Sequence, residues 1–263
     1  MNPIRRMSRL ARYRSKPPKG MQFPVVTNNQ IPLDFVENGT VGEIFLSHVG
    51  RPTSKWTQYL DVYEMYLSRV REAKSSSAIK LIEIGVADGG SLEVWRRYFG
   101  VNSKVVGIDI DPKVNGVLDE GIEVVTGSQT DAAVLERCVH ILGGSVDVVI
   151  DDGSHRGRDQ IKSFEYLWPR LNYGGVYIVE DLHTSYWTDF SGGPGRQGTF
   201  MEYAKLLMDD MHLWYHRRAR TRLAKEMMHS LLSISCHDSI IVMTKAKRAQ
   251  PTRVDFGAGA SRR

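Results

Sequence analysis

Residues 80–91, KLIEIGVADGGS, decide the fold of this chain. A short apolar run leads into a glycine-rich turn, and a helical pattern follows over residues 91–99. Glycine permits a tight turn and lets the backbone come close to a ligand. A strand, a glycine-rich turn and a helix in this order predict the first βα unit of a nucleotide-binding sheet.

The same alternation continues along the chain. After the apolar run at 79–85, further runs lie at 104–110, 122–127, 146–151 and 174–181. Helical stretches near 91–99, 112–119, 130–142 and 157–170 separate them. Apolar strands joined by helical crossovers predict an α/β fold, a Rossmann-like doubly wound sheet that is mostly parallel.

The C-terminal part of this pattern differs from a simple βα repeat. A long helical region at 199–227 precedes two β-rich runs that meet at His237 and Asp238. We expect these runs to form an antiparallel hairpin that closes the sheet. Dehydrogenases usually continue in parallel βα units at this point, so the hairpin favours a different class of enzyme.

The two ends of the chain are basic. The chain has 263 residues and a net charge of +5, and its first twenty residues hold seven Lys or Arg and no acid. We predict a partly disordered N-terminal arm and approach segment at 1–54, a catalytic domain at 55–245 and a flexible basic tail at 246–263.

No signal peptide and no apolar run of membrane-spanning length is present, so we expect a cytoplasmic protein without a membrane span. Cys138 and Cys236 have no metal-ligand spacing and are expected to be free thiols.

An aromatic stripe follows the approach segment. The sequence KWTQYLDVYEMYLSRVREAK places apolar side chains at helical spacing on one face: Trp56, Tyr59, Leu60, Tyr63, Tyr66, Leu67 and Val70. This pattern predicts a helix that packs on the sheet. Core packing is the favoured role of the stripe, ahead of ligand binding.

The glycine-rich turn and the strand before it predict a cofactor site. Gly85, Gly89 and Ser91 lie in the turn, and Asp109 ends the second strand, where an acid holds a ribose diol in this fold. Glu83 inside the first strand would repel a pyrophosphate. It suits instead the amine of a cationic cofactor that carries an amino acid.

Polar residues after the third strand complete this site. Ser128 and Gln129 lie where an adenine ring is expected. Together with the acids on the first two strands they favour S-adenosylmethionine, and NAD remains the alternative.

The fourth and fifth strands both end in acids. VVIDDGSH (148–155) contains Asp151 and Asp152, and VYIVEDLHTSYW (176–187) contains Glu180 and Asp181. Neighbouring strand ends meet at one edge of a parallel sheet, and four carboxylates there repel one another unless a cation is bound. Oxygen ligands favour Mg²⁺, with Mn²⁺ or Ca²⁺ as alternatives. Helix capping by Asp152 or Ser154 explains the first of these acidic ends equally well, but not the second.

A histidine lies beside the first acidic end. His155 follows Asp152 by three residues, and imidazole accepts a proton near neutral pH. A metal makes a bound alcohol more acidic, and His155 would then take its proton. The alcohol oxygen would attack the sulfonium methyl group in line.

Five stretches resemble one enzyme family: EIGVADGGSLEVWRRYF, GIDID, VVIDDGSH, GGVYIVEDLHTSYW and SISCHDSIIVMTK. They are similar to the metal-dependent class I sugar O-methyltransferases of the mycinamicin type, and to relatives that methylate bacterial glycans such as methylmannose polysaccharides. The resemblance covers about residues 55–245. Ala87 departs from the plain GxGxG motif, and the large N-terminal domain of the mycinamicin-type enzyme is not expected in this chain.

The resemblance implies roles for several residues. Asp152, Glu180 and Asp181 would be metal ligands, and His155 the general base. Asp109 would hold the cofactor ribose and Gln129 would contact the adenine. Independently of the resemblance, Asp151 ends the fourth strand, and we expect it to orient its neighbours at the cofactor site.

The acceptor is expected to be a sugar or an oligosaccharide. Tyr186 and Trp187 lie in a glycine-rich loop where they could stack on a sugar face or pack on the hairpin, and residues 212–218 could line an acceptor groove or form a solvated surface. Alternatives are a catechol or small diol as acceptor, an NAD-dependent oxidoreductase, and a non-catalytic protein that binds RNA through its basic ends. The sugar, its hydroxyl and the oligomeric state stay open.

Overall fold

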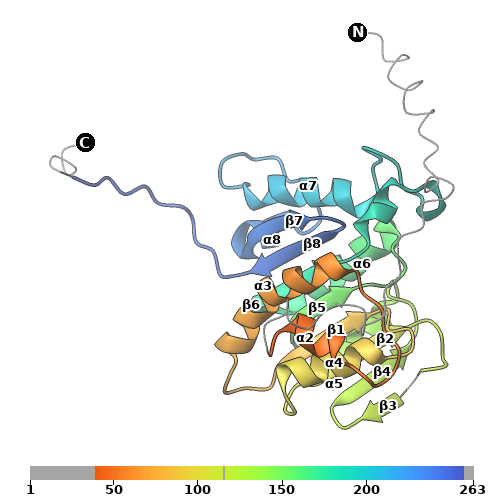
Figure 1. The fold of residues 1–263 in the computed structure, drawn as a ribbon. Helices are drawn as coiled ribbons and strands as arrows, with labels where there is room; N and C mark the ends of the chain where they lie inside the picture. Colours follow the sequence, from red (N-terminus) through yellow and green to blue (C-terminus); the bar gives the residue numbers. More distant parts are fainter. Residues whose placement is uncertain (1–38, 115, 258–263) are drawn as a thin grey trace.

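The computed structural model describes residues 39–114 and 116–257, which form an eight-stranded sheet between two layers of helices (Figure 1). The strand order is β3-β4-β2-β1-β5-β6-β8-β7. The strands are β1 (Lys80–Ile84), β2 (Lys104–Asp109), β3 (Gly116–Asp119), β4 (Ile122–Thr126), β5 (Val146–Asp151), β6 (Leu171–Val179), β7 (Leu231–His237) and β8 (Ile240–Lys245). Strands β4, β2, β1, β5 and β6 are parallel, while β3 and β8 run antiparallel to their neighbours. The predicted doubly wound sheet with a C-terminal hairpin is confirmed.

Helices cover both faces of the sheet. They are α2 (Val41–Leu46), α3 (Thr57–Ala73), α4 (Gly90–Phe99), α5 (Ala132–Ile141), α6 (Gly157–Leu167), α7 (Phe200–Met211) and α8 (Ala224–Ser230). One core cluster joins α2, α3 and α4 to the sheet around Tyr63 and Trp95, and the other joins α5 to α8 around Phe164 and Phe200. Strand β5 is buried along its whole length, as expected of a strand covered on both faces.

The register of the three central strands determines where the acidic residues lie. Ile84 of β1 pairs with Asp151 of β5, which pairs in turn with Val179 of β6. The residues that follow these three in the chain lie at one level beyond the sheet: Gly85, Asp152 and Glu180. The ladder of backbone hydrogen bonds continues into these residues, because the Asp152 amide donates to the Ile84 carbonyl at 2.9 Å and the Glu180 amide to the Asp151 carbonyl at 2.9 Å.

Two helical predictions were wrong. Residues 116–119 form the edge strand β3, which pairs antiparallel with β4, instead of the end of a helix at 112–119. The stretch is short and begins at Gly116 with a φ of 83°, so edge pairing satisfies more backbone groups than one helical turn. The region 199–227 is not one helix, because the chain leaves the helical path after α7 and returns to it only at α8.

The hairpin turn lies one residue later than predicted. Strand β7 ends at His237, and the turn consists of Asp238 and Ser239, with Ser239 in the left-handed region at a φ of 66°. Strand β6 begins at Leu171 and ends at Val179, so Glu180 and Asp181 follow the strand.

The approach segment contains a helix that the sequence pattern did not predict. Helix α2 contributes Val41 and Ile44 to the core cluster that includes α3 and α4. The predicted disordered arm lies largely in residues 1–38, outside the described part. Residues 246–257 contain no helix or strand. Cys138 and Cys236 are both free thiols, as expected. In the part of the chain that the structure describes, no helix is both long and apolar enough to span a membrane.

We predict that Gly85→Ala destabilises the domain strongly. Gly85 has a φ of +82°, and a Cβ at this position would lie 2.1 Å from the Asp152 carbonyl oxygen. The variant therefore combines backbone strain with a clash against main chain, and we expect a loss of about 3 kcal/mol or more in unfolding free energy by urea denaturation.

Gly174→Ala is the matched control for this prediction. Gly174 has a φ of +84° but nothing within 4 Å of the added Cβ, so we expect a loss of only about 1 kcal/mol. Equal losses of unfolding free energy in the two variants would contradict the prediction, because they would show that the 151–153 turn leaves room for a Cβ at position 85.

Candidate active site

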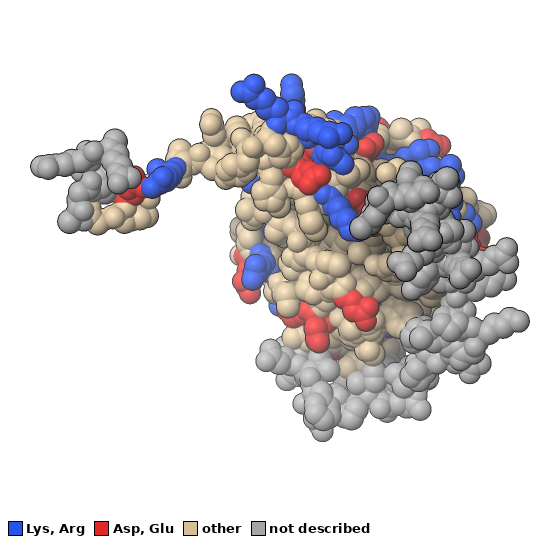
Figure 2. All heavy atoms as spheres, turned by 90° about the horizontal axis from the view of Figure 1, so that it is seen from above, with Lys and Arg blue, Asp and Glu red and all other residues tan. Residues whose placement is uncertain are grey.

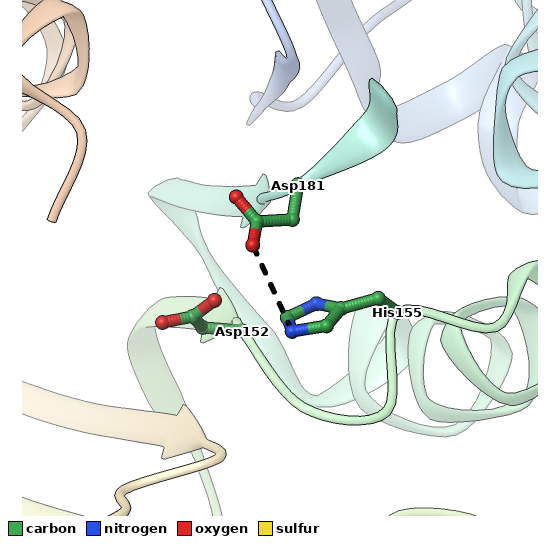
Figure 3. Close-up of side chains that lie close together, drawn as sticks. All are labelled: Asp152, His155 and Asp181. Carbon is green, nitrogen blue, oxygen red and sulfur yellow. Dashed lines mark ion pairs between the residues drawn. The ribbon is translucent and has the colours of Figure 1, made fainter. Parts of the chain in front are cut away.

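Three side chains converge at the carboxyl edge of the sheet. Asp152 follows β5, His155 lies in the turn before α6, and Asp181 follows β6 (Figure 3). One ligand atom from each lies within 4.8 Å of the others, and His155 Nε2 is 3.7 Å from Asp181 Oδ2. Their side chains are 22–23% exposed, so the group is open to a ligand while largely shielded from bulk water.

Two of these residues have a strained backbone. His155 has a φ of 55° and Asp181 a φ of 54°, in the left-handed region that non-glycine residues rarely adopt. The Thr184 hydroxyl lies 3.0 Å from the His155 carbonyl and 2.6 Å from the Asp181 carbonyl, in position to donate to either. Strain of this kind concentrates at functional sites, where the surrounding structure holds it in place.

The capping interpretation of the first acidic end was wrong. Helix α6 begins at Gly157 with Arg156 as its N-cap, and no side chain caps it. Ser154 Oγ donates instead to Asp159 Oδ2 at 3.0 Å. Asp152 is therefore available for another role.

The aromatic stripe of α3 has a second role besides packing. Trp56 Nε1 and the Tyr59 hydroxyl donate to Asp181 Oδ1 at 3.0 and 2.9 Å, and the Tyr63 hydroxyl donates to Glu180 Oε1 at 2.5 Å. Burial and the adjacent Glu180 raise the pKa of Tyr63 well above its ordinary value, so this hydroxyl keeps its proton and donates. The core-packing prediction was correct for Tyr59 and Tyr63, which are fully buried, but it missed these hydrogen bonds.

Lys55 is the functional residue that sequence reasoning missed. Its Nζ lies 2.6 Å from Asp152 Oδ2, 2.9 Å from Glu180 Oε2 and 3.4 Å from Glu83 Oε1, and its side chain is 5% exposed. Burial disfavours the charge, but Asp152 and Glu180 outweigh burial and raise the pKa of Lys55 well above its ordinary value. A single lysine before a helix is common, so the sequence contained no signal for a role of Lys55 apart from its position next to Trp56.

Glu180 lies apart from the open group of three. Its side chain is 1% exposed, and its two oxygens accept hydrogen bonds from Tyr63 and Lys55. Burial, the largest influence, raises its pKa, and Lys55 opposes this effect. The ligand role of Glu180 stays a prediction, and in the observed arrangement its Oε2 is paired with the Lys55 ammonium group at 2.9 Å.

Asp151 and Gln129 organise the turn that carries Asp152. Gln129 Nε2 lies 3.1 Å from both oxygens of the Asp151 carboxylate, and Gln129 Oε1 accepts from the Ser154 amide at 2.8 Å. Ser163 Oγ donates to Asp151 Oδ2 at 2.6 Å. Asp151 is fully buried and Gln129 is 7% exposed. The expected orienting role of Asp151 matches these contacts, while the adenine contact of Gln129 stays a prediction.

The glycine-rich turn is held by two acids. Asp109 Oδ2 accepts from the amides of Val86 and Ala87, both at 3.0 Å. Glu83 is fully buried and accepts from Ser91 Oγ at 2.7 Å, and burial raises its pKa. Gly89 has a φ of 89° and precedes α4.

The segment before Lys55 passes directly over this turn. A Cβ on Gly90 would lie 2.1 Å from the Arg51 carbonyl oxygen and 2.6 Å from that of Pro52. Residues 51–55 therefore run from the start of α4 to the carboxylates that surround the Lys55 ammonium group. They link the glycine-rich turn to the group of Asp152, His155 and Asp181. Ser128 follows β4, and its hydroxyl is 2.9 Å from that of Thr130.

The C-terminal hairpin supports the second acidic end. The Ser239 carbonyl accepts from the Leu182 amide at 2.8 Å, and its oxygen lies 3.1 Å from the Tyr59 hydroxyl, which can donate to it as the alternative to Asp181. Ser239 Oγ lies 2.6 Å from His183 Nδ1. The turn of the closing hairpin is thus part of the framework around Asp181.

Aromatic rings border the open group. The Trp187 ring lies 4.6 Å from that of His183 and 6.1 Å from that of Phe190, and Phe190 lies 6.2 Å from His155. Trp187 is half-buried and Tyr186 is 42% exposed. The rings of Trp187 and Phe190 therefore form an aromatic wall that reaches His155.

Residues 212–218 are not part of this site. Helix α7 begins beside Gly157, close to the site, and these residues follow its opposite end (Figure 1). Trp214 Nε1 donates to the Met228 carbonyl, and Arg217 and Arg218 are exposed. On the face seen from above, Lys and Arg gather along one edge with acids scattered among them (Figure 2). The exposure of Arg217 and Arg218 fits the interpretation of this cluster as a solvated surface.

Comparisons with known proteins find methyltransferases among the proteins similar to this chain. Residues 82–182 match the family described as a methyltransferase domain. The chain is 34% identical over 203 residues to the 8-demethyl-8-alpha-L-rhamnosyl tetracenomycin-C 2'-O-methyltransferase of Streptomyces olivaceus, covering 73% of this chain and 52% of that protein. It is 29% identical over 224 residues to the 8-demethyl-8-(2-methoxy-alpha-L-rhamnosyl)-tetracenomycin-C 3'-O-methyltransferase of the same organism, covering 81% and 56%.

A solved structure has the same fold. The MycE methyltransferase from the mycinamycin biosynthetic pathway, in complex with Mg and SAH, has a TM-score of 0.67 and 25% identity, and the match covers 79% of this chain and 54% of MycE. The chain spans about half the length of the curated relatives it matches. Residues 82–182 thus form a methyltransferase domain, and both the class I fold and the resemblance to the mycinamicin-type enzymes are confirmed.

We predict that Asp151→Asn changes how stability depends on pH. Burial raises the pKa of Asp151 from 3.8 to about 6, so the folded protein disfavours the ionised carboxyl. The contribution of Asp151 to the stability of the wild type is greatest below the unfolded pKa and falls by up to about 3 kcal/mol as pH rises through about 6. Asn does not ionise, so the unfolding free energy of the wild type minus that of the variant should decrease over this range and level off above it.

Urea denaturation at a series of pH values, without added metal, measures this difference. Asp147→Asn is the control, because Asp147 is a buried aspartate at the start of the same strand, paired with Lys74. A difference between wild type and Asp151→Asn that stays constant from about pH 4 to about pH 7 would contradict the prediction.

Proposed function

We propose that this protein is an S-adenosylmethionine-dependent O-methyltransferase, assisted by a divalent metal, that transfers a methyl group to a sugar hydroxyl. The observation that carries the proposal is the group of Asp152, His155 and Asp181, whose ligand atoms lie within 4.8 Å of one another. This group lies at the same edge of the sheet as the glycine-rich turn after β1. The match to sugar O-methyltransferases supports the reaction class.

The residues present fit a divalent cation. Within residues 39–114 and 116–257, Asp152 Oδ1 and Asp181 Oδ2 accept no hydrogen bond, while the other oxygen of each is held by Lys55 or by α3. Carboxylate oxygens are the donors that Mg²⁺ prefers, and they also suit Mn²⁺ and Ca²⁺. Asp152 and Asp181 would hold the metal, with Glu180 as the third predicted ligand. Mg²⁺ bound there would make an acceptor hydroxyl more acidic and orient it.

The cofactor would lie over the turn at residues 85–91. Gly85 and Gly89 would let the backbone approach the ligand, Asp109 would bind the ribose, and Ser128 and Gln129 would contact the adenine. Glu83 would face the amino group of the cofactor. The complex of MycE with Mg and SAH supports this assignment, because the fold around the turn is shared.

His155 would act as the general base. Its Nε2 would accept the proton of the acceptor hydroxyl while the oxygen forms a bond to the methyl carbon and the sulfur–methyl bond breaks, leaving S-adenosylhomocysteine. Asp181, 3.7 Å from Nε2, would stabilise the imidazolium that forms. Because Asp181 is itself held by Trp56 and Tyr59, the base and its partner keep a fixed geometry.

The acceptor would bind against the aromatic wall. The Phe190 ring lies next to His155 and the Trp187 ring lies next to Phe190, and together they offer an apolar surface of the kind on which a sugar ring stacks. The names of the relatives place their methyl groups on rhamnosyl units. A deoxysugar glycoside is therefore the acceptor to test first, and a methylmannose oligosaccharide, which the sequence resemblance suggested, is the second.

We predict metal-dependent methyl transfer to a sugar. Labelled S-adenosylmethionine should methylate at least one member of a panel of deoxysugar glycosides and mannose oligosaccharides, EDTA should abolish transfer, and added Mg²⁺ should restore it. Asp181→Asn should lower kcat/KM by about 100-fold or more while S-adenosylhomocysteine binding, measured by calorimetry, persists. Transfer only to a catechol would contradict the sugar assignment, and binding of NADH in place of S-adenosylhomocysteine would contradict the reaction class.

We predict that His155→Ala lowers kcat by about 100- to 10,000-fold, because the acceptor proton loses its base. Binding of Mg²⁺ and S-adenosylhomocysteine should be nearly unchanged. His140→Ala, at the exposed C-terminal end of α5, is the control and should retain wild-type activity. Full activity of His155→Ala would exclude His155 as the base.

A further inference from the structure

The ammonium group of Lys55 occupies the space between two of the three predicted metal ligands. Its Nζ is 2.6 Å from Asp152 Oδ2 and 2.9 Å from Glu180 Oε2. We propose that Lys55 competes with a divalent cation for Asp152 and Glu180, and that this residue thereby sets the metal affinity of the site. The inference rests on the metal-assisted function proposed above.

The competition follows from charge and burial. A cation that takes both carboxylates must displace the ammonium group or lie within a few ångströms of it. Like charges repel strongly at such distances when water is largely excluded. Because the Lys55 side chain is 5% exposed and Glu180 is 1% exposed, water screens little of this repulsion. A positive charge at Lys55 therefore disfavours a second cation at the same carboxylates.

The chain keeps the ammonium group close to the site when it leaves these two acids. Glu83 Oε1, 3.4 Å from Nζ, is a third carboxylate that is not among the predicted metal ligands. The neighbouring residue Trp56 is bound to Asp181, and residues 51 and 52 pack on the start of α4. The backbone on both sides of Lys55 is thus held in place. The ammonium group that leaves Asp152 and Glu180 can still pair with Glu83, next to the glycine-rich turn.

A purely supporting role for Lys55 makes the opposite prediction. If the ammonium group only kept Asp152 and Glu180 in place, its loss would disorder these ligands and weaken metal binding. Competition predicts that its loss strengthens metal binding. The sign of the change in affinity therefore separates the two roles.

The test is Mn²⁺ binding to the full-length protein, followed by electron paramagnetic resonance of free Mn²⁺ without cofactor or acceptor. We expect Lys55→Gln, which keeps an N–H donor but no charge, to bind Mn²⁺ at least about tenfold more tightly than the wild type. Lys55→Arg, which keeps the charge, should bind no more tightly than the wild type. Binding by Lys55→Gln alone, with none by the wild type, would support competition in its strongest form.

Lys74→Gln is the matched control. Lys74 Nζ pairs with the buried carboxylate of Asp147 at 2.5 Å, and Asp147 lies at the start of β5, the opposite end from Asp152. This variant loses a lysine–aspartate pair of the same kind and should bind Mn²⁺ with wild-type affinity. Its thermal stability shows the general cost of such a loss.

Unchanged or weaker Mn²⁺ binding by Lys55→Gln, with binding by the wild type intact, would overturn the inference and leave the proposed function standing. If Lys55→Gln folds poorly, the change in melting temperature that Mn²⁺ produces gives the same information, since competition predicts a larger increase in the variant than in the wild type. Failure of the proposed function is seen separately, as no methyl transfer and no binding of S-adenosylhomocysteine by the wild type. Absence of Mn²⁺ binding in every variant would overturn both.

Discussion

Three carboxylates share one ammonium group at the carboxyl edge of the sheet, and the surrounding structure is arranged around that interaction. The parallel register of β1, β5 and β6 places Asp152 and Glu180 at one level, with Glu83 two residues before Gly85 on the central strand. Such a concentration of negative charge is costly to bury without a compensating cation. Lys55 provides the positive charge, and the hydroxyls of Tyr63 and Ser91 hold the remaining oxygens of Glu180 and Glu83.

Helix α3 connects this charge balance to the hydrophobic core. Its aromatic side chains fill one face of the sheet and at the same time direct polar atoms toward the acids that follow β6. Tyr59 also bonds the turn of the C-terminal hairpin, so segments far apart in the sequence meet at Asp181. Packing and polar positioning are therefore performed by the same residues, and a change in one of them affects both stability and site geometry.

The partly exposed residues of the site and the buried residues behind them differ in what they can contact. Asp152, His155 and Asp181 retain partial exposure and left-handed backbone at two of three positions, which suits them to contact ligands. Asp151, Gln129 and Ser163 lie behind them in a buried hydrogen-bond network. A satisfied network of this kind holds a turn rigidly, and a rigid turn would keep the proposed base and the proposed metal ligand at a constant distance.

The sequence by itself determined the doubly wound sheet, its closing hairpin and the acids at the ends of β5 and β6, because strand periodicity, glycine turns and adjacent carboxylates are local patterns. It did not determine the edge strand β3 or the break between α7 and α8, where pairing and packing outweigh weak local preference. Only the tertiary structure revealed that Lys55 bridges Asp152 and Glu180, and that Glu180 is separated from the open group. Those contacts join residues about a hundred positions apart, and a buried ion pair depends on the three-dimensional path of the chain, which no local pattern records.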